Sequence, residues 1–80
     1  MENVKKYNEI FVEVFSVDLT DLNGKFDRDS VANWDSIHQL NLISYIEEVF
    51  DIMFDVEDVL GFTSYAKGKD ILSSKYEVIF

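Results

Sequence analysis

Apolar residues recur along this chain at intervals of three and four positions. Between positions 4 and 14 they are Val4, Tyr7, Ile10, Phe11 and Val14. An α-helix turns once in about 3.6 residues, so this spacing gathers all five on one face. The positions between them carry Lys and Glu, which suit the opposite, solvated face. The pattern predicts a helix over residues 4–14.

A second helical pattern fills the segment WDSIHQLNLISYIEEVFDI, residues 34–52. We expect this helix to begin at Asp35 or Ser36 and to end near Phe50. On a helical wheel most of its large apolar residues share one side, which predicts a core face made of Leu42, Ile43, Ile46, Val49, Phe50 and Met53. The opposite side carries Ile37, Leu40, Asn41, Ser44, Glu48 and Asp51.

The remaining segments predict one long loop and two shorter helices. Residues 16–34 lose the helical period and are rich in Asp, Asn and Ser, so they indicate a loop. Its isolated apolar residues are its expected anchors, namely Leu19, Leu22, Phe26 and Val31. Residues 55–60 allow one or two helical turns that Gly61 closes, and Ser64 is the expected N-cap of a last helix.

The resulting prediction is an all-α fold in which residues 1–80 form one small four-helix bundle with a short third helix. The last eight residues, SSKYEVIF, either extend the fourth helix or fold back onto the bundle. Without cysteine, a chain of 80 residues depends on its hydrophobic core instead of disulfides. An apolar content of 48% is enough to expect such a core rather than a disordered acidic tail.

The charge of the chain limits its possible partners. A formal net charge of −9 disfavours nucleic acid and anionic membrane surfaces and favours basic proteins. No run is apolar and long enough for a signal peptide or a membrane span, so we expect a cytoplasmic monomer without membrane insertion.

The acidic residues are concentrated in the middle of the sequence. Between Arg28 and Lys67 there is no Lys or Arg, which predicts one strongly negative side; an ordinary solvated surface is the alternative. The acidic residues of this interval are Asp29, Asp35, Glu47, Glu48, Asp51, Asp55, Glu57 and Asp58.

Metal-binding and catalytic motifs fit the sequence poorly. An EF-hand alignment on Gly24 puts Leu19 at the first acidic ligand position and Ser30 at the position of the bidentate glutamate. The single histidine, His38, has no cysteine or second histidine with which to bind zinc, and we expect it to be an exposed helix residue. Ser36 and His38 are two positions apart on a helix and point in different directions. We therefore expect neither a metal site nor an enzyme.

Two apolar residues lie where a solvated helix normally carries charge. Ile37 and Leu40 follow directly after Ser36 and lie off the predicted core face. They predict a contact with a partner protein. The alternative is that they pack beneath the preceding loop, against Phe26 or Trp34.

The segment around Ser36 resembles the second helix of the acyl carrier protein family. Asp and Ser before an apolar helix are common capping residues on their own. In that family, however, an Asp-Ser-Leu motif opens the helix and a Glu-Glu-x-Phe pattern follows, and here DSI and EEVF occupy the corresponding positions. The first helix, the long loop, the short acidic third helix and FTSYAKGKDIL extend the resemblance over nearly the whole chain.

The resemblance implies that Ser36 carries 4′-phosphopantetheine, transferred from coenzyme A by a phosphopantetheinyl transferase, and that Asp35 helps position the metal and the hydroxyl in that complex. A helix N-terminus suits the phosphodiester because its free N–H groups favour an anion. The implied function is that of an acyl carrier protein, which holds an acyl group as a thioester and presents it to acyl-loading and acyl-transferring enzymes with basic docking surfaces. The residues predicted to bind these partners are Ile37, Leu40, Asn41, Glu47 and Glu48.

Departures from the family pattern leave other functions open. Ile37 replaces the usual Leu, and His38, Gln39 and Asn41 are neutral where carriers of bulk fatty-acid synthesis often have acidic residues. This favours a carrier in a dedicated pathway. The alternatives are an aminoacyl carrier of the D-alanyl or peptidyl type, and an acidic adaptor domain that is never modified.

Overall fold

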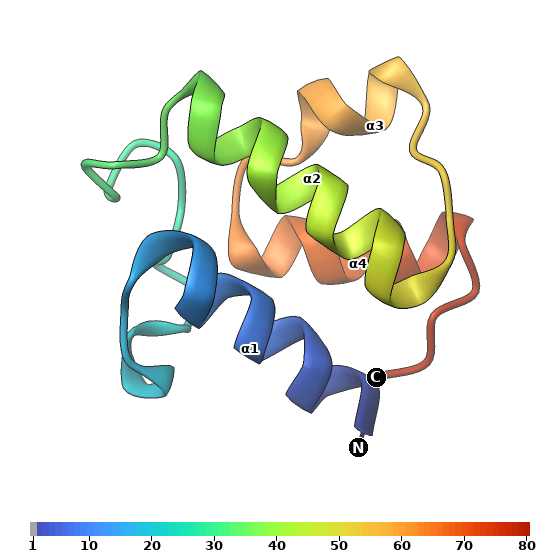
Figure 1. The fold of residues 1–80 in the computed structure, drawn as a ribbon, viewed down its shortest axis with the longest axis horizontal. Coiled ribbons are helices and arrows are strands. Elements are labelled where there is room, and N and C mark those ends of the chain that lie inside the picture. Colours follow the sequence, from blue (N-terminus) through green and yellow to red (C-terminus); the bar gives the residue numbers. More distant parts are fainter. Residues whose placement is uncertain (1) are drawn as a thin grey trace.

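The computed structural model describes residues 2–80 and contains four α-helices (Figure 1). They are α1 (Glu2–Phe15), α2 (Ser36–Phe50), α3 (Val56–Gly61) and α4 (Tyr65–Lys75), with a 3-10 turn, η1 (Leu19–Asp21), in the first loop. Residues 2–80 include no β-strand, although Asp27 and Ser64 form one isolated bridge. The predicted all-α class and the small helical bundle with a short third helix are confirmed.

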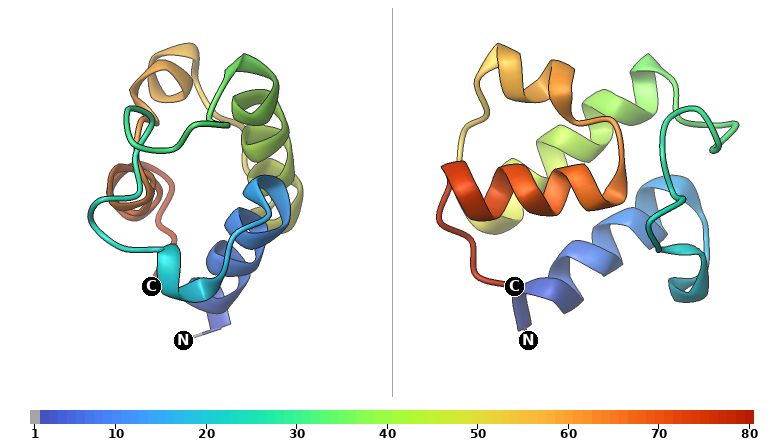
Figure 2. Two further views of the ribbon diagram at one scale, coloured as in Figure 1. Left: turned by 90° about the vertical axis from the view of Figure 1, so that its left-hand side faces the viewer. Right: turned by 180° about the vertical axis from the view of Figure 1, so that it is seen from behind.

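The helices surround a shared core. Figure 2 shows α1 and α2 on one side of the molecule and α3 and α4 on the other, with α3 beside the first turns of α2. The principal dimensions are 29 × 27 × 20 Å. The end of the chain returns to the beginning of α1 (Figure 1).

Aromatic rings dominate the core, and Phe11 of α1 lies at its centre. Its ring centroid is 4.8–6.3 Å from those of Tyr7, Phe15, Phe26, Trp34, Phe62 and Tyr65. Offset and edge-to-face ring pairs at these distances add stabilisation beyond the area that they bury. The aromatic residues scattered through the sequence therefore converge on one point.

A close approach between α4 and α1 depends on a glycine. A Cβ atom at Gly68 would lie 2.2 Å from Cζ of Phe62 and 2.2 Å from the hydroxyl oxygen of Tyr7. The Tyr7 hydroxyl donates a hydrogen bond to the carbonyl oxygen of Tyr65 at 2.6 Å, and burial raises the pKa of Tyr7. Any side chain at position 68 would push these groups apart.

The second helix has the predicted bounds, but one predicted core residue lies outside it. Asp51 adopts a left-handed conformation with φ of 54° and ends α2. The chain turns away at this point, and Met53 is 82% exposed. The prediction that Met53 lies in the core is therefore wrong, because α2 ends at Phe50 and the chain beyond Asp51 no longer follows the helical period.

The long loop is attached to the beginning of α4. The backbone N–H of Tyr65 donates to the Phe26 carbonyl, and that of Arg28 to the Thr63 carbonyl, both at 2.9 Å. Phe26 is buried, as predicted, and Leu22 and Val31 are half-buried. Leu19 is 61% exposed, so its predicted role as an anchor is wrong: η1 turns it outward.

The chain after α4 folds back onto the bundle, which decides between the two alternatives for this segment. Val78 is buried, and the side-chain amide of Asn3 donates to the Ile79 carbonyl at 2.9 Å. The Phe80 ring packs against Tyr7, with centroids 5.3 Å apart. These contacts close the bundle at the N-terminal end of α1.

Candidate functional site

The N-terminus of α2 presents Ser36 to solvent. Asp35 is the N-cap: its Oδ1 accepts a hydrogen bond from the backbone N–H of His38 at 2.9 Å and lies 2.8 Å from Nδ1 of the same residue. The backbone hydrogen bond, followed by the one from the ring, holds the pKa of Asp35 below its ordinary value. Ser36 is the first helical residue and is exposed, so its hydroxyl is accessible and is not needed as the cap.

His38 is less exposed than the sequence suggested. Its side chain is 30% exposed, and its ring stacks on Phe15 with centroids 5.8 Å apart and planes 16° from parallel. The prediction of an exposed histidine is therefore wrong. The ring covers the core beside the cap.

Gln39 links the loop, α2 and α3, a role that the sequence did not indicate. Its side-chain Nε2 donates to the carbonyl oxygens of Val59 and Phe62 at 3.0 and 3.2 Å. Its Oε1 accepts a hydrogen bond from the Trp34 indole at 2.5 Å. One side chain thus satisfies carbonyls at the end of α3 and orients a buried ring.

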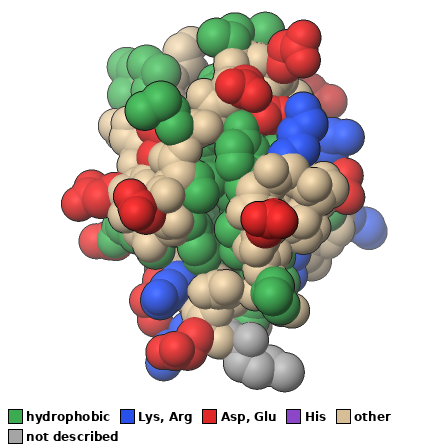
Figure 3. Space-filling model, turned by 90° about the vertical axis from the view of Figure 1, so that its right-hand side faces the viewer, with side chains coloured by type: hydrophobic (Ala, Val, Ile, Leu, Met, Phe, Trp, Pro, Cys, Tyr) green, Lys and Arg blue, Asp and Glu red, His purple; other side chains and the backbone are tan. Residues whose placement is uncertain are grey.

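Large apolar side chains are exposed on α2, on α3 and in the turn between them. The exposed fractions lie between 64% and 82% for a set that we call the α2–α3 apolar surface: Ile37, Leu40, Met53, Val56 and Leu60. Figure 3 shows hydrophobic side chains exposed at the upper end of the molecule, where α3 lies in Figure 1, with Asp and Glu around them. Ile37 and Leu40 do not pack beneath the loop, so that alternative is wrong.

The other predicted partner-binding residues lie in different surroundings. Glu47 is half-buried, and its Oε2 accepts a hydrogen bond from the backbone N–H of Phe54 at 2.8 Å. Asn41 and Glu48 are exposed and line a groove that faces α1. The structure thus brings Ile37 and Leu40 together with α3, and separates Asn41 and Glu48 from them.

One of the eight clustered carboxylates is buried and paired. Asp58 is 4% exposed. Its two oxygens accept hydrogen bonds from Nζ of Lys75 at 2.7 Å and from the hydroxyl of Tyr76 at 2.6 Å. These two contacts, that of Lys75 first, hold the pKa of Asp58 below its ordinary value. The predicted negative face therefore has one member fewer than the sequence indicated.

Residues 2–80 contain no group of three or more His, Cys, Asp or Glu side chains arranged to hold a metal ion. Within the same residues, no helix combines the length and the apolar character needed to cross a membrane.

Comparison with known proteins gives one informative similarity. No protein-family model matches the chain, and no solved structure matches it. The chain is similar to a curated protein of Encephalitozoon cuniculi (strain GB-M1) named a probable importin, with 39% identity over 80 residues. The match covers 88% of this chain but 8% of that protein, so the chain corresponds to a small segment of it.

This similarity corrects the function expected from the sequence. The matched protein is named as an importin and not as a carrier of acyl or aminoacyl groups. The expected acyl-carrier function, with its link to fatty acid biosynthesis and lipid metabolism, is contradicted. The attachment of 4′-phosphopantetheine to Ser36 and the local resemblance around it are separate predictions, which this match does not test.

Proposed function

We propose that this domain is a protein-docking module with a nuclear-transport-related role, and that its α2–α3 apolar surface contacts a basic partner protein. The observation that carries the proposal is the exposure of five large apolar side chains, four on α2 and α3 and one, Met53, in the turn between them. Exposed apolar patches rimmed by polar residues commonly mark sites of protein interaction. The similarity to a segment of a probable importin supports the transport-related context.

The charge around this surface supports a basic partner. Asp51, Asp55 and Glu57 are exposed on α3 and in the turn between α2 and α3. Such carboxylates would attract a cationic protein over a distance and accelerate its association, while the apolar side chains would supply the contact itself. The expected complex is dynamic, with fast association that weakens as salt is added.

A designed peptide can test this proposal. The probe is a fluorescent helical peptide of leucine and lysine with one leucine face, and its binding is followed by fluorescence anisotropy. Replacing both Ile37 and Leu60 with Ser should weaken binding by about tenfold or more, since burial of an aliphatic side chain contributes about 1–2 kcal/mol. Leu19→Ser is the matched control, because Leu19 is similarly exposed but lies in η1.

The Leu19→Ser control shows whether the peptide binds the α2–α3 apolar surface selectively. Leu19→Ser should leave binding unchanged, and added salt should weaken binding to the wild-type domain. Equal losses in the control and in the double variant would show that the peptide binds exposed leucines without selection. In that case the α2–α3 apolar surface is not the docking site.

We also propose that Ser36 accepts 4′-phosphopantetheine. The structural support is a good fit: the hydroxyl is exposed at the N-terminus of a 15-residue helix, where free N–H groups favour a phosphate, and Asp35 already supplies the cap. The bound group would provide a thiol, which this chain lacks. This proposal concerns the modification alone and does not restore the corrected acyl-carrier function.

Intact mass after incubation with coenzyme A and a broad-specificity phosphopantetheinyl transferase tests the modification. We expect the wild-type mass to increase by one phosphopantetheine group and the Ser36→Ala variant to stay unmodified. Ser44→Ala, an exposed serine two turns further along α2, should be modified normally. Modification of Ser36→Ala, or of no variant at all, would contradict the assignment without affecting the peptide-binding result.

A further inference from the structure

A groove between α1 and α2 lies apart from Ser36 and from the α2–α3 apolar surface. It has a volume of about 460 Å³ and is lined by Val14, Asn41, Ser44, Tyr45 and Glu48. Val14 and the Tyr45 ring are half-buried and form an apolar floor, whereas Asn41, Ser44 and Glu48 are exposed. The groove can thus receive a side chain that has an apolar stem.

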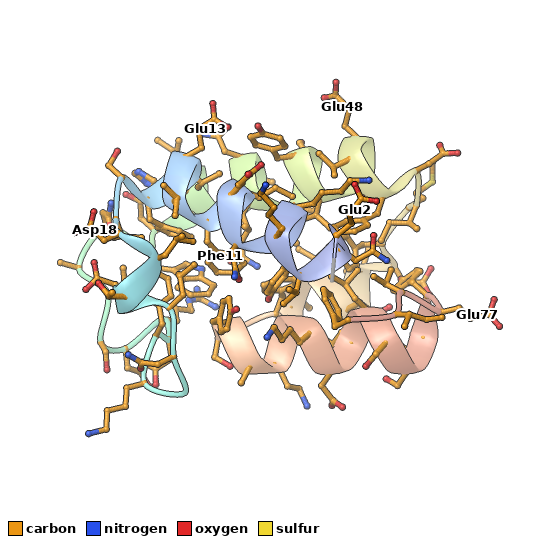
Figure 4. The ribbon with its side chains drawn as sticks, turned by 90° about the horizontal axis from the view of Figure 1, so that it is seen from below. Glu2, Phe11, Glu13, Asp18, Glu48 and Glu77 are labelled. Atoms are coloured by element: carbon orange, nitrogen blue, oxygen red, sulfur yellow. The ribbon has the colours of Figure 1, made fainter. Side chains whose placement is uncertain are left out.

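Carboxylates of both helices lie beside this groove: Glu48 of α2 lines it, and Glu13 of α1 contacts Tyr45. The Tyr45 hydroxyl donates a hydrogen bond to Oε2 of Glu13. That bond, together with burial and the charges of Glu13, Glu9 and Glu48, raises the pKa of Tyr45. Figure 4 shows Glu13 and Glu48 pointing to the same side of the molecule from α1 and α2.

Among residues 2–80, no Lys, Arg or His side chain forms an ion pair with these carboxylates. The ion pairs among residues 2–80 are Lys75 with Asp58 and His38 with Asp35, so neither Glu9, Glu13 nor Glu48 has a cationic partner in the described chain. Three carboxylates above an apolar floor are complementary to a lysine or arginine, whose aliphatic stem packs on apolar surface while its charged end remains near anions.

We propose that the α1–α2 groove is a second docking site, which binds a lysine- or arginine-bearing segment of a partner protein. The cationic end of the inserted side chain lies among Glu9, Glu13 and Glu48. Its stem packs against Val14 and the Tyr45 ring. This site does not depend on the proposed role of the α2–α3 apolar surface, because the two surfaces share no residue.

Titration of the ¹⁵N-labelled domain with a hexalysine peptide, followed by NMR, tests the site. We expect the largest amide shifts at Asn41, Ser44 and Tyr45. Neutralising two rim carboxylates, by Glu13→Gln with Glu48→Gln, should weaken binding about fivefold at about 150 mM salt. Glu57→Gln with Glu77→Gln is the matched control, since both residues are exposed, lie elsewhere and remove the same charge.

A third variant keeps the test independent of the Glu13 contact to Tyr45. Ser44→Lys places a cation at the exposed edge of the groove and should compete with the peptide, weakening binding at least as much as the double glutamine variant. Equal weakening in the control pair, or shifts centred on α3, would overturn the proposal, because the peptide would then respond only to net charge or to the other surface. Self-association that the double variant abolishes would also overturn it, in favour of a second copy of this chain.

Discussion

Single polar side chains attach the short helix α3 to the rest of the domain. A helix of six residues has few internal hydrogen bonds and is not stable alone. Gln39 binds carbonyls near its end, Glu47 binds the backbone just before it, and Asp58 joins it to Lys75 and Tyr76. These contacts hold the apolar residues of α3 in place beside α2.

Replacing Asp58 with Asn should therefore destabilise the domain in a pH-dependent way. Asn keeps the size of the side chain but loses the charge that Lys75 and Tyr76 stabilise. Because the pKa of Asp58 is lowered in the folded state, its stabilisation is complete above the unfolded-state pKa of about 4 and is lost as pH falls through the folded-state pKa. Urea unfolding should show a difference between wild type and Asp58→Asn at neutral pH that shrinks below about pH 4.

Asp70→Asn is the control for this measurement, because Asp70 is an exposed residue of α4. It should change the free energy of unfolding little at any pH. A difference for Asp58→Asn that stayed constant down to strongly acidic pH would show that its packing, and not its charge, stabilises the fold.

The positions of the helices could be predicted from the sequence, because helix formation depends on residues that are close together in the chain. The apolar period and the capping residues located the helices, and Asp35 and Ser64 form the expected caps. The exposure of Leu19 and Met53 could not be predicted in this way, since each side chain's exposure depends on where the chain turns in three dimensions. The contacts of Gln39 and Asp58 join residues 17–23 positions apart, and no periodicity reports such distances.

The segment after α4 offers a test at the scale of helices. Val78 is 8% exposed, whereas its neighbour Ile79 is 79% exposed. We expect Val78→Ala to lower the free energy of unfolding by about 1–2 kcal/mol through lost burial and a small cavity, and Ile79→Ala to change it by less than about 0.5 kcal/mol. Chemical denaturation of both variants measures the difference, and equal effects would mean that the segment does not pack as the structure describes.

For the whole molecule, the sequence predicted the fold better than the function. The helical bundle follows from periodicity, and the exposure of Ser36 follows from its position at the start of α2. The function does not follow from either, because one helical architecture can support many different activities. The sequence did place Ile37 and Leu40 off the core face. The exposure of Met53, Val56 and Leu60 and the groove between α1 and α2 depend on how the helices pack, so they became visible only in the structure.

The net charge of −9 should have opposite effects on folding and on binding. Seven of the eight carboxylates between Arg28 and Lys67 lie outside the buried Asp58 pair, and their repulsion should favour the unfolded chain. Salt or magnesium should therefore raise the melting temperature, by about 4–8 °C for each kcal/mol gained in a domain of this size. The same salt should weaken the attraction of a basic partner.

A variant with fewer negative charges distinguishes the screening of carboxylate repulsion from the effects that salt has on any folded protein. Asp29→Lys with Glu48→Lys places two cations within the acidic run, and since each change adds two charges, the net charge moves from −9 to −5. Both residues are exposed. Thermal melts at low and moderate sodium chloride should show a smaller salt dependence for this variant than for the wild type, because less repulsion remains to be screened. The same slope in both proteins would instead assign the effect of salt to apolar burial, which salt also strengthens and which does not depend on these charges.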